Sequence, residues 1–345
     1  MSRLRWGFLG AGRIADVMAE NLLTEGHAIV AVAARAKDRA EAFAARHGIE
    51  RSHGGYAALV SDPDVDVVYV NTTQNFHAEH ALLALGAGKP VLVEKSFTRN
   101  AAEARQIADA ARAAGVFAME AMWTRFLPTM VTLRRWIADG LLGEVTAVYS
   151  DHSQSLNTDP TGRHHNPELG GGALLDLGVY NVSFAHDLLG APESVASRTI
   201  LTATGVDAEV SMLLGHAGGA QSVHHTSMVN PGPNRAAVIG TNGYVEVDPV
   251  FYSWTSLSRY DASRPAALVE RFEPTLTSRG MHFQAVEVER CLTEGLTESP
   301  LMTLDDSIAV METLDELRRQ AGVRYPGSDA QQHPVPRGVT LSGGR

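Results

Sequence analysis

A glycine-rich turn between an apolar segment and a helical one most strongly constrains how this chain can fold. Residues 5–9 form a short, largely apolar run, and residues 10–15 then read GAGRIA before a segment with helical apolar spacing. Gly10 permits a tight turn, Gly12 lets the backbone approach an anion, and Ala15 allows close packing of helix on strand. We therefore expect the helix N-terminus to face a dinucleotide pyrophosphate, and a turn that only joins strand to helix is the alternative. The residues expected at the phosphates are Gly10, Ala11, Gly12, Arg13 and Ile14.

The first third of the chain alternates short apolar runs with amphipathic segments. Strands are expected at residues 5–9, 29–33, 67–70, 91–94 and 116–118. Helices are expected between them, at residues 15–24, 37–47, 77–87 and 101–114. This alternation predicts an α/β domain of the Rossmann type, with a doubly wound parallel sheet, over residues 1–122.

After residue 122 the strict alternation of strand and helix stops, and the order of expected elements becomes typical of an α+β domain. Successive strand-like runs separated by Gly, Asn and Pro predict an open, mostly antiparallel sheet, and we assign residues 123–325 to this second domain. The polar segment 326–345 is expected to be a mobile tail. The strands are expected at residues 145–150, 195–201, 209–214, 220–228, 235–240 and 244–247, and the helices at 127–139, 172–189, 281–294 and 304–320.

Length and composition exclude several classes of protein. A chain of 345 residues exceeds what one core usually supports, which agrees with two domains. The net charge of -10 and the absence of a basic cluster argue against a nucleic-acid partner. No apolar run approaches the roughly 18 residues of a membrane span. The single cysteine, Cys291, rules out an internal disulfide, so we expect a cytoplasmic protein.

Two adjacent histidine pairs stand out but do not have the spacing of a metal site. His164 and His165 are neighbours, as are His224 and His225, and adjacent side chains do not converge on one ion. We therefore expect no metal. His152, His164 and His165 either line the substrate site from their loop or are solvated.

The end of the second strand indicates which dinucleotide is bound. NAD-specific sites usually place an acidic residue about 20 residues after the glycine loop, to bind the ribose 2′-hydroxyl. Here the chain has Arg35, with Arg39 one turn later, and guanidinium groups suit a 2′-phosphate. NADP is therefore favoured, and the alternative is a solvated Arg35 in an enzyme that accepts NAD as well.

Three polar side chains are candidates for the chemistry. Lys95 follows a buried strand at the sheet edge where such folds bind ligands, in a chain with only three lysines. Asp176 and Tyr180 are four residues apart in an apolar helix and so share one face. Burying a carboxylate and a phenol is costly unless they are paired, which indicates either a polar site or a core tyrosine bonded to Asp176.

Four motifs together resemble the glucose-fructose oxidoreductase, inositol dehydrogenase and MocA family over nearly the whole chain. They are the glycine loop, Glu94-Lys95, residues 123–126 (WTRF) and residues 171–180 (GGALLDLGVY). Tyr180 and residues 119–126 (MEAMWTRF) resemble the branch of dimeric dihydrodiol dehydrogenase, NADP-dependent xylose dehydrogenase and glucose-fructose oxidoreductase. The resemblance implies an NADP-dependent oxidoreductase acting on a CH–OH group of a sugar, cyclic polyol or trans-dihydrodiol, and a homodimer or homotetramer formed through the second-domain sheet.

The resemblance also implies roles for individual residues. Tyr180 would be the acid/base, its pKa brought toward the working pH by Lys95, and Asp176 would orient the substrate or Lys95. Cofactor contacts implied in the same way are Glu94, Lys95, Thr72, Thr73, Asn75, His77, Trp123 and Arg125. The alternatives are a solvated His77 at the start of a helix, and an interdomain packing role for Trp123 and Arg125.

One residue departs from the family pattern, and two other functions stay open. Ser96 stands where the family motif has proline, so a cis peptide bond before it is not expected. A non-catalytic NADP-binding sensor is one alternative, although Lys95, Asp176 and Tyr180 are all present. A sugar–sugar oxidoreductase with tightly bound NADP is the other.

Overall fold

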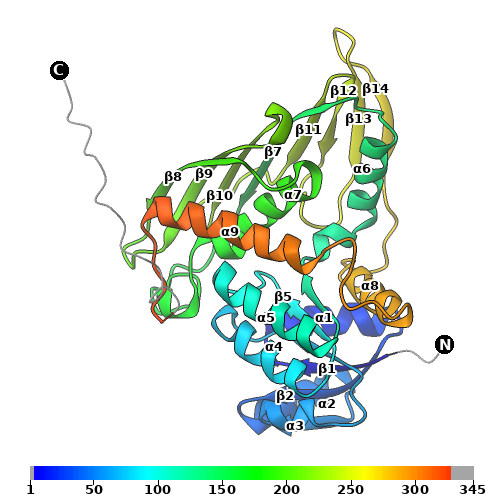
Figure 1. Ribbon diagram of the computed structural model, residues 1–345, viewed down its shortest axis with the longest axis vertical. Helices are drawn as coiled ribbons and strands as arrows, with labels where there is room; N and C mark the ends of the chain where they lie inside the picture. The colour runs from blue at the N-terminus through cyan, green and yellow to red at the C-terminus, as the bar shows by residue number, and fades with distance from the viewer. Residues whose placement is uncertain (1–3, 328–345) are drawn as a thin grey trace.

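The structure is a computed structural model that describes residues 4–327, and it shows two sheets with helices between them (Figure 1). Sheet A lies in the N-terminal part of the chain, and sheet B is formed by later strands. Most of the segment expected to be a mobile tail lies outside the described residues. Within residues 4–327, no helix is long and apolar enough to cross a membrane.

Sheet A is parallel and doubly wound, as the β-α alternation predicted. Its strand order is β3-β2-β1-β4-β5-β6, so the order reverses between β1 and β4. Ligands bind such sheets at this switch point, beyond the carboxyl ends of the strands. The strands are β1 (Arg5–Leu9), β2 (Ala28–Ala34), β3 (Arg51–Gly54), β4 (Val67–Val70), β5 (Val91–Glu94) and β6 (Ala118–Ala121), and the helices are α1 (Arg13–Thr24), α2 (Lys37–His47), α3 (Tyr56–Val60), α4 (His77–Gly86) and α5 (Ala101–Ala114).

Two local predictions for this sheet were wrong. Strand β3 and helix α3 were not expected, because β3 is a polar edge strand without buried side chains. The last strand was expected at residues 116–118, but it begins at Ala118. Gly115 has a left-handed conformation and the Val116 amide still bonds to Ala111 O at 3.0 Å, so these residues complete the end of α5.

Sheet B is mostly antiparallel, in the order β14-β13-β12-β11-β7-β10-β9-β8, and only β10 and β7 pair in parallel. The sequence missed the hairpin β13–β14 at one edge, where all but one of the β14 side chains are exposed and no apolar alternation marks the strand. The strands are β7 (Val145–Ser153), β8 (Ser194–Leu201), β9 (Asp207–Gly215), β10 (Gln221–Ser227), β11 (Ala236–Gly240), β12 (Gly243–Val247), β13 (Leu257–Asp261) and β14 (Leu268–Phe272).

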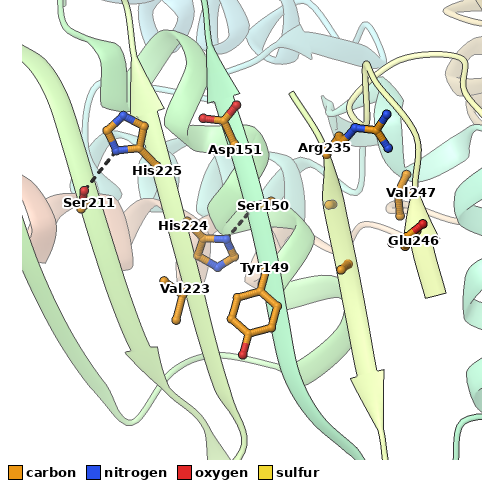
Figure 2. A pocket seen from close by; sticks show the side chains of 12 residues that line it. Tyr149, Ser150, Asp151, Ser211, Val223, His224, His225, Arg235, Glu246 and Val247 are labelled. Carbon is orange, nitrogen blue, oxygen red and sulfur yellow. Dashed lines mark hydrogen bonds between the residues drawn. The ribbon is translucent and has the colours of Figure 1, made fainter. Parts of the chain in front are cut away.

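The two faces of sheet B differ. Helix α7 (Val179–Leu189) covers one face, where the Asn181 amide donates a hydrogen bond to Ser150 Oγ at 2.8 Å. The other face exposes Tyr149, Leu213 and Val223, which are 46%, 48% and 42% exposed. It also carries an open hollow of about 450 Å³ over β7, β9, β10 and β11 (Figure 2).

The remaining helices join the two sheets. Helix α6 (Pro128–Ala138) leads into sheet B, and α8 (His282–Thr293) returns to pack near α1, where the Met281 amide donates to Asn21 Oδ1 at 3.2 Å. Helix α9 (Leu304–Ala321) pairs with α5 through Arg105 and Glu312. Because α9 also bonds to α7, through His186 and Thr313 at 3.0 Å, it fixes sheet B against sheet A.

Candidate active site

The glycine loop forms an open turn at the N-terminus of α1. Gly10 has φ +135, and a Cβ there would lie 2.0 Å from Asn71 Oδ1, so no larger residue fits without displacing Asn71. Gly12 is the N-cap, without a side-chain hydrogen bond, and a Cβ there would meet nothing within 4 Å. Open space in front of free helix amides is what a pyrophosphate group requires, so these residues fit a dinucleotide.

Two arginines follow β2, at the same edge of sheet A as the glycine loop that follows β1. Arg35 is exposed and its guanidinium lies 5.8 Å from the centre of the Phe76 ring, while Arg39 is exposed in the first turn of α2. The end of β2 has no acidic residue that could bind a ribose 2′-hydroxyl, because residues 33–35 are Ala, Ala and Arg. This arrangement suits a 2′-phosphate.

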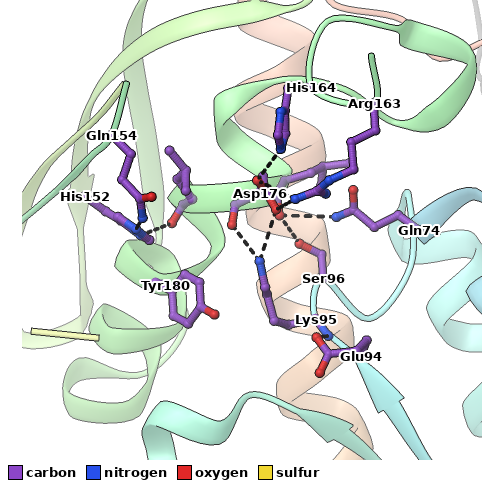
Figure 3. A network of polar contacts seen from close by, with 12 residues as sticks. Gln74, Glu94, Lys95, Ser96, His152, Gln154, Arg163, His164, Asp176 and Tyr180 are labelled. Atoms are coloured by element: carbon purple, nitrogen blue, oxygen red, sulfur yellow. Dashed lines mark hydrogen bonds and ion pairs between the residues drawn. The ribbon is translucent and has the colours of Figure 1, made fainter. Parts of the chain in front are cut away.

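Lys95 lies just beyond the end of β5 and reaches across the space between the two sheets (Figure 3). Its ammonium donates to the backbone oxygen of Asp176 at 2.8 Å and to Asp176 Oδ1 at 3.2 Å. The same nitrogen lies 5.0 Å from the centre of the Tyr180 ring. The structure therefore brings together the three residues that the sequence singled out.

Asp176 is held by three basic side chains. Lys95 Nζ lies 3.2 Å from it, Arg163 Nη2 lies 3.1 Å away, and His164 Nε2 lies 3.5 Å away. Burial alone raises the pKa of Asp176, but the charges of Lys95, Arg163 and His164 outweigh burial and hold that pKa below its usual value. Asp176 is therefore a carboxylate at neutral pH.

Tyr180 is buried, and its oxygen accepts a hydrogen bond from Trp123 Nε1 at 3.0 Å. The alternative of a core tyrosine bonded to Asp176 is therefore wrong. Burial raises the pKa of Tyr180, and Lys95 lowers it by less. The expectation that Lys95 brings this pKa toward neutrality is thus wrong for the protein alone, because burial and the nearby Glu94 and Asp176 charges outweigh one ammonium group.

Both halves of the chain match models of one oxidoreductase family. Residues 4–122 match the model of the oxidoreductase family with an NAD-binding Rossmann fold, and residues 130–246 match the GFO/IDH/MocA C-terminal domain. The chain is similar to trans-1,2-dihydrobenzene-1,2-diol dehydrogenase of Xenopus laevis, at 36% identity over 329 residues covering 93% of this chain and 99% of the relative. The Sus scrofa protein of that name is 37% identical over 94% of this chain and 98% of its own.

The chain belongs to the GFO/IDH/MocA family of oxidoreductases. Among solved structures, aldose-aldose oxidoreductase from Caulobacter crescentus has a TM-score of 0.84 at 24% identity, covering 93% of this chain and 98% of that one. A 3-ketoreductase from Actinomadura kijaniata, solved in complex with NADP, has a TM-score of 0.81 at 25% identity, covering 92% and 98%. As a family member, the protein is an NAD(P)-dependent dehydrogenase.

Two residues expected at the cofactor of this family member have other partners. The indole N–H of Trp123 is used by Tyr180. Arg125 is buried, with its Nε donating to Ser183 Oγ at 3.2 Å and its Nη1 lying 3.6 Å from Asp306. These contacts tie Arg125 to α7, which carries Ser183, and to α9, which carries Asp306, all within residues 123–325.

The segment after β4 lies beside Lys95. The ring nitrogens of His77 face Ser96 O at 3.0 Å and Thr72 O at 3.1 Å, and burial lowers the pKa of His77 to about 4. The solvated reading of His77 is therefore wrong, because its neutral imidazole lies between two backbone segments. Thr73 is exposed, and Asn75 Oδ1 is buried without a hydrogen-bond partner among the described residues.

The peptide bond between Lys95 and Ser96 is cis, contrary to the expectation drawn from the missing proline. Serine makes one contact here that proline could not make, because its hydroxyl donates to Leu175 O at 2.5 Å. Its backbone oxygen faces His77 Nδ1. Ser96 therefore fixes the segment after Lys95 against the segment that carries Asp176.

Glu94 supports Lys95 from the inner side. Its carboxyl accepts hydrogen bonds from the Tyr69 hydroxyl and, at 3.1 Å, from the Lys95 amide. Burial raises the pKa of Glu94 to about 7. Glu94 is therefore buried directly beside Lys95, away from solvent.

The end of β7 and the loop that follows it supply side chains whose roles sequence reasoning left open or missed. His152 is buried and stacks on Tyr252 at 3.7 Å between ring centres, and it lies 5.1 Å from the Tyr180 ring. His164 contacts Asp176, whereas His165 is buried nearby with an unpartnered Nε2. Arg163 was missed, although its position next to His164 and His165 was a usable signal. In residues 4–327, no group of three His, Cys, Asp or Glu side chains has metal-site geometry.

Asp207 on β9 positions the helix that carries Asp176 and Tyr180, and sequence reasoning missed it. Its Oδ2 accepts a hydrogen bond from the Leu174 amide at 2.5 Å, at the start of the π-helical turn η4 (Leu174–Gly178) that leads into α7. Gly172 has φ +122, and a Cβ there would lie 2.3 Å from Asp207 Oδ1. The carboxyl thus caps this helix from within the protein.

We expect Asp207→Asn to reduce the pH dependence of stability. Burial raises the pKa of Asp207 from 3.8 to about 7, so the folded chain binds this proton more tightly than the unfolded chain does. Stability should therefore fall as pH rises between those two values, and the carboxamide removes this contribution. Urea unfolding of both proteins at pH 5 and pH 8 measures the difference. An unchanged pH dependence would contradict the assignment.

Proposed function

We propose that the protein is an NADP-dependent dehydrogenase that interconverts a CH–OH group and a carbonyl in a sugar, cyclic polyol or trans-dihydrodiol. The observation that carries this proposal is the meeting of Lys95, Asp176 and Tyr180 beside the carboxyl edge of sheet A. Relatives named for a dihydrodiol and a solved levoglucosan dehydrogenase complex with a TM-score of 0.83 support the substrate class.

The chemistry divides between the cofactor and three side chains. A bound nicotinamide supplies the redox step, because it accepts or donates a hydride. Tyr180 takes the proton from the substrate hydroxyl, or returns it in the reverse reaction, and Lys95 stabilises negative charge on the substrate oxygen. Asp176 positions the Lys95 ammonium through its carboxylate and its backbone oxygen.

The pKa of Tyr180 affects the direction of the reaction. Since burial raises this pKa above its ordinary value of 10, the phenol is protonated at neutral pH and ready to donate to a carbonyl. Oxidation of the alcohol requires the phenolate form of Tyr180, which accepts the proton of the substrate hydroxyl and is favoured by alkaline pH. We therefore propose reduction as the faster direction at neutral pH.

The cofactor site proposed from the sequence is retained, with its residues in three groups. The glycine loop faces the pyrophosphate. The two arginines after β2 face the 2′-phosphate, and the residues that follow β4 and β5 face the nicotinamide half of the cofactor. The proposed contacts are Gly10, Ala11, Gly12, Arg13, Ile14, Arg35, Arg39, Thr72, Thr73, Asn75, His77, Glu94, Lys95, Trp123 and Arg125. NADP is preferred, and binding of NAD is possible.

Removing the phenol or the ammonium should abolish turnover without abolishing cofactor binding. We expect Tyr180→Phe and Lys95→Met each to lower kcat by about 100-fold or more, the usual range for a lost acid/base group. NADPH binding, followed by fluorescence titration, should persist in both variants. Tyr244→Phe is the matched control, because Tyr244 stacks on Tyr260 in sheet B and should leave kcat unchanged. Full activity in Tyr180→Phe would refute the assignment.

Arg35 should set the preference for NADP. Arg35→Ala removes a bidentate phosphate ligand, which we expect to weaken NADPH binding by about tenfold or more while leaving NADH binding unchanged. Lys37→Ala is the control, since Lys37 is an exposed cation close in sequence that pairs with Glu41 at 3.5 Å. Parallel titrations with NADPH and NADH measure both affinities. Equal weakening by the two variants would show that only general positive charge matters.

We also propose that the open face of sheet B forms a homodimer or homotetramer. Tyr149, Leu213 and Val223 expose apolar surface on neighbouring strands of that face, around the hollow of Figure 2. Exposed apolar surface of this kind marks an association surface. The proposed compartment is the cytoplasm, which rests on the single cysteine, Cys291.

A charge on this face should dissociate the assembly. We expect Val223→Asp to give a monomer, because association would bury the new carboxylate without a partner. Light scattering after size-exclusion chromatography measures the mass. Val131→Asp is the control, since Val131 is 49% exposed on α6 and lies outside the sheet. A wild-type monomer would refute the proposal.

A further inference from the structure

Asn71 lies at the switch point of sheet A, directly against the glycine loop. It follows β4, and its backbone amide donates to Leu9 O at 3.2 Å, at the end of β1. Its side chain is so close to Gly10 that a Cβ on that glycine would lie 2.0 Å from Asn71 Oδ1. Sequence reasoning did not select this residue.

The Asn71 amide is buried without hydrogen bonds. The residue is 4% exposed, and neither Oδ1 nor Nδ2 has a partner among the described residues. Leaving a buried polar group unsatisfied costs free energy, so such groups call for an explanation. Asn21 shows the contrast, because it is equally buried but donates to Val17 O at 2.8 Å and accepts from the Met281 amide at 3.2 Å.

We propose that Asn71 binds the dinucleotide, and that its amide is satisfied only in the loaded enzyme. The carboxamide offers one acceptor and one donor group, so a single partner that satisfies both must itself donate and accept. A sugar hydroxyl does both, whereas phosphate oxygens only accept. Asn71 therefore binds a hydroxyl of the ribose next to the pyrophosphate, on the nicotinamide side. This assignment rests on the proposed cofactor site and adds a residue to it.

The position of Asn71 in the fold supports this ribose over the adenosine one. Asn71 is followed directly by Thr72, whose backbone oxygen faces His77, and His77 in turn faces Ser96 next to Lys95. Arg35 and Arg39, the proposed 2′-phosphate ligands, follow β2 on the other side of β1. Asn71 thus stands between the glycine loop and the reactive side chains.

Asn71→Leu separates this role from a structural one. Leucine has a similar size and no polar atoms, so the free protein should keep or raise its Tm, because an unsatisfied amide is removed. NADPH binding should weaken by about tenfold. Asn21→Leu is the matched control, and its Tm should fall, since a satisfied buried amide is lost. Differential scanning fluorimetry measures Tm, and fluorescence titration measures the NADPH affinity.

Two fragments of the cofactor locate the contact. 2′-Phospho-ADP-ribose keeps the pyrophosphate and the second ribose, and we expect Asn71→Leu to weaken its binding as much as that of NADPH. 2′,5′-ADP lacks both groups, so its affinity should not change. Isothermal titration calorimetry with the full chain measures each.

The remaining outcomes overturn the proposal. These are unchanged NADPH affinity, an equal loss for all three ligands, a loss for NADPH alone, or a fall in Tm matching that of Asn21→Leu. Failure of the proposed function is distinguishable, because the wild-type protein would then bind neither NADPH nor 2′-phospho-ADP-ribose.

Discussion

The ion pair between Lys95 and Asp176 is the interaction on which the site depends. Lys95 belongs to the edge of sheet A and Asp176 to the helix packed on sheet B, and each side chain is 13% exposed. Removing one partner of such a pair leaves a largely buried charge without compensation, which typically costs about 3–5 kcal/mol. The pair therefore forces the two sheets to keep one relative position, and that position brings Tyr180 beside Lys95.

The surrounding side chains hold this pair from both sides. Ser96 and Gln74 bond to Leu175 O, at 2.5 and 3.3 Å, so the backbone before Asp176 is tied to sheet A. On the other side Arg163, which is half exposed, adds a second cation to Asp176. Burial raises the pKa of both acids of the site, but only for Asp176 do the neighbouring charges outweigh it. Asp176 stays ionised because cations surround it, while the Tyr180 phenol stays protonated.

The sequence predicted much of the fold because its signals are local. The glycine loop and the alternation of strand and helix identified sheet A, and the Gly-rich separators of the second half identified an antiparallel sheet. The failures have a common physical cause, since β3 and β14 are edge strands without a single buried side chain, and β13 pairs with β14. Edge strands depend on pairing with neighbours, and such pairing leaves little trace in apolar spacing.

The sequence by itself determined the types of residue available for the chemistry: a glycine turn, two arginines after β2, and Lys95, Asp176 and Tyr180 in motifs that resemble one family. Only the tertiary structure decided how these residues are partnered and charged. In it the Tyr180 oxygen accepts a hydrogen bond from Trp123, Arg125 donates to Ser183, and the Asn71 amide has no partner among residues 4–327. The reason is that pKa values and hydrogen bonds are set by burial and by contacts between residues far apart in the sequence, such as Lys95 and Asp176, which are 81 positions apart.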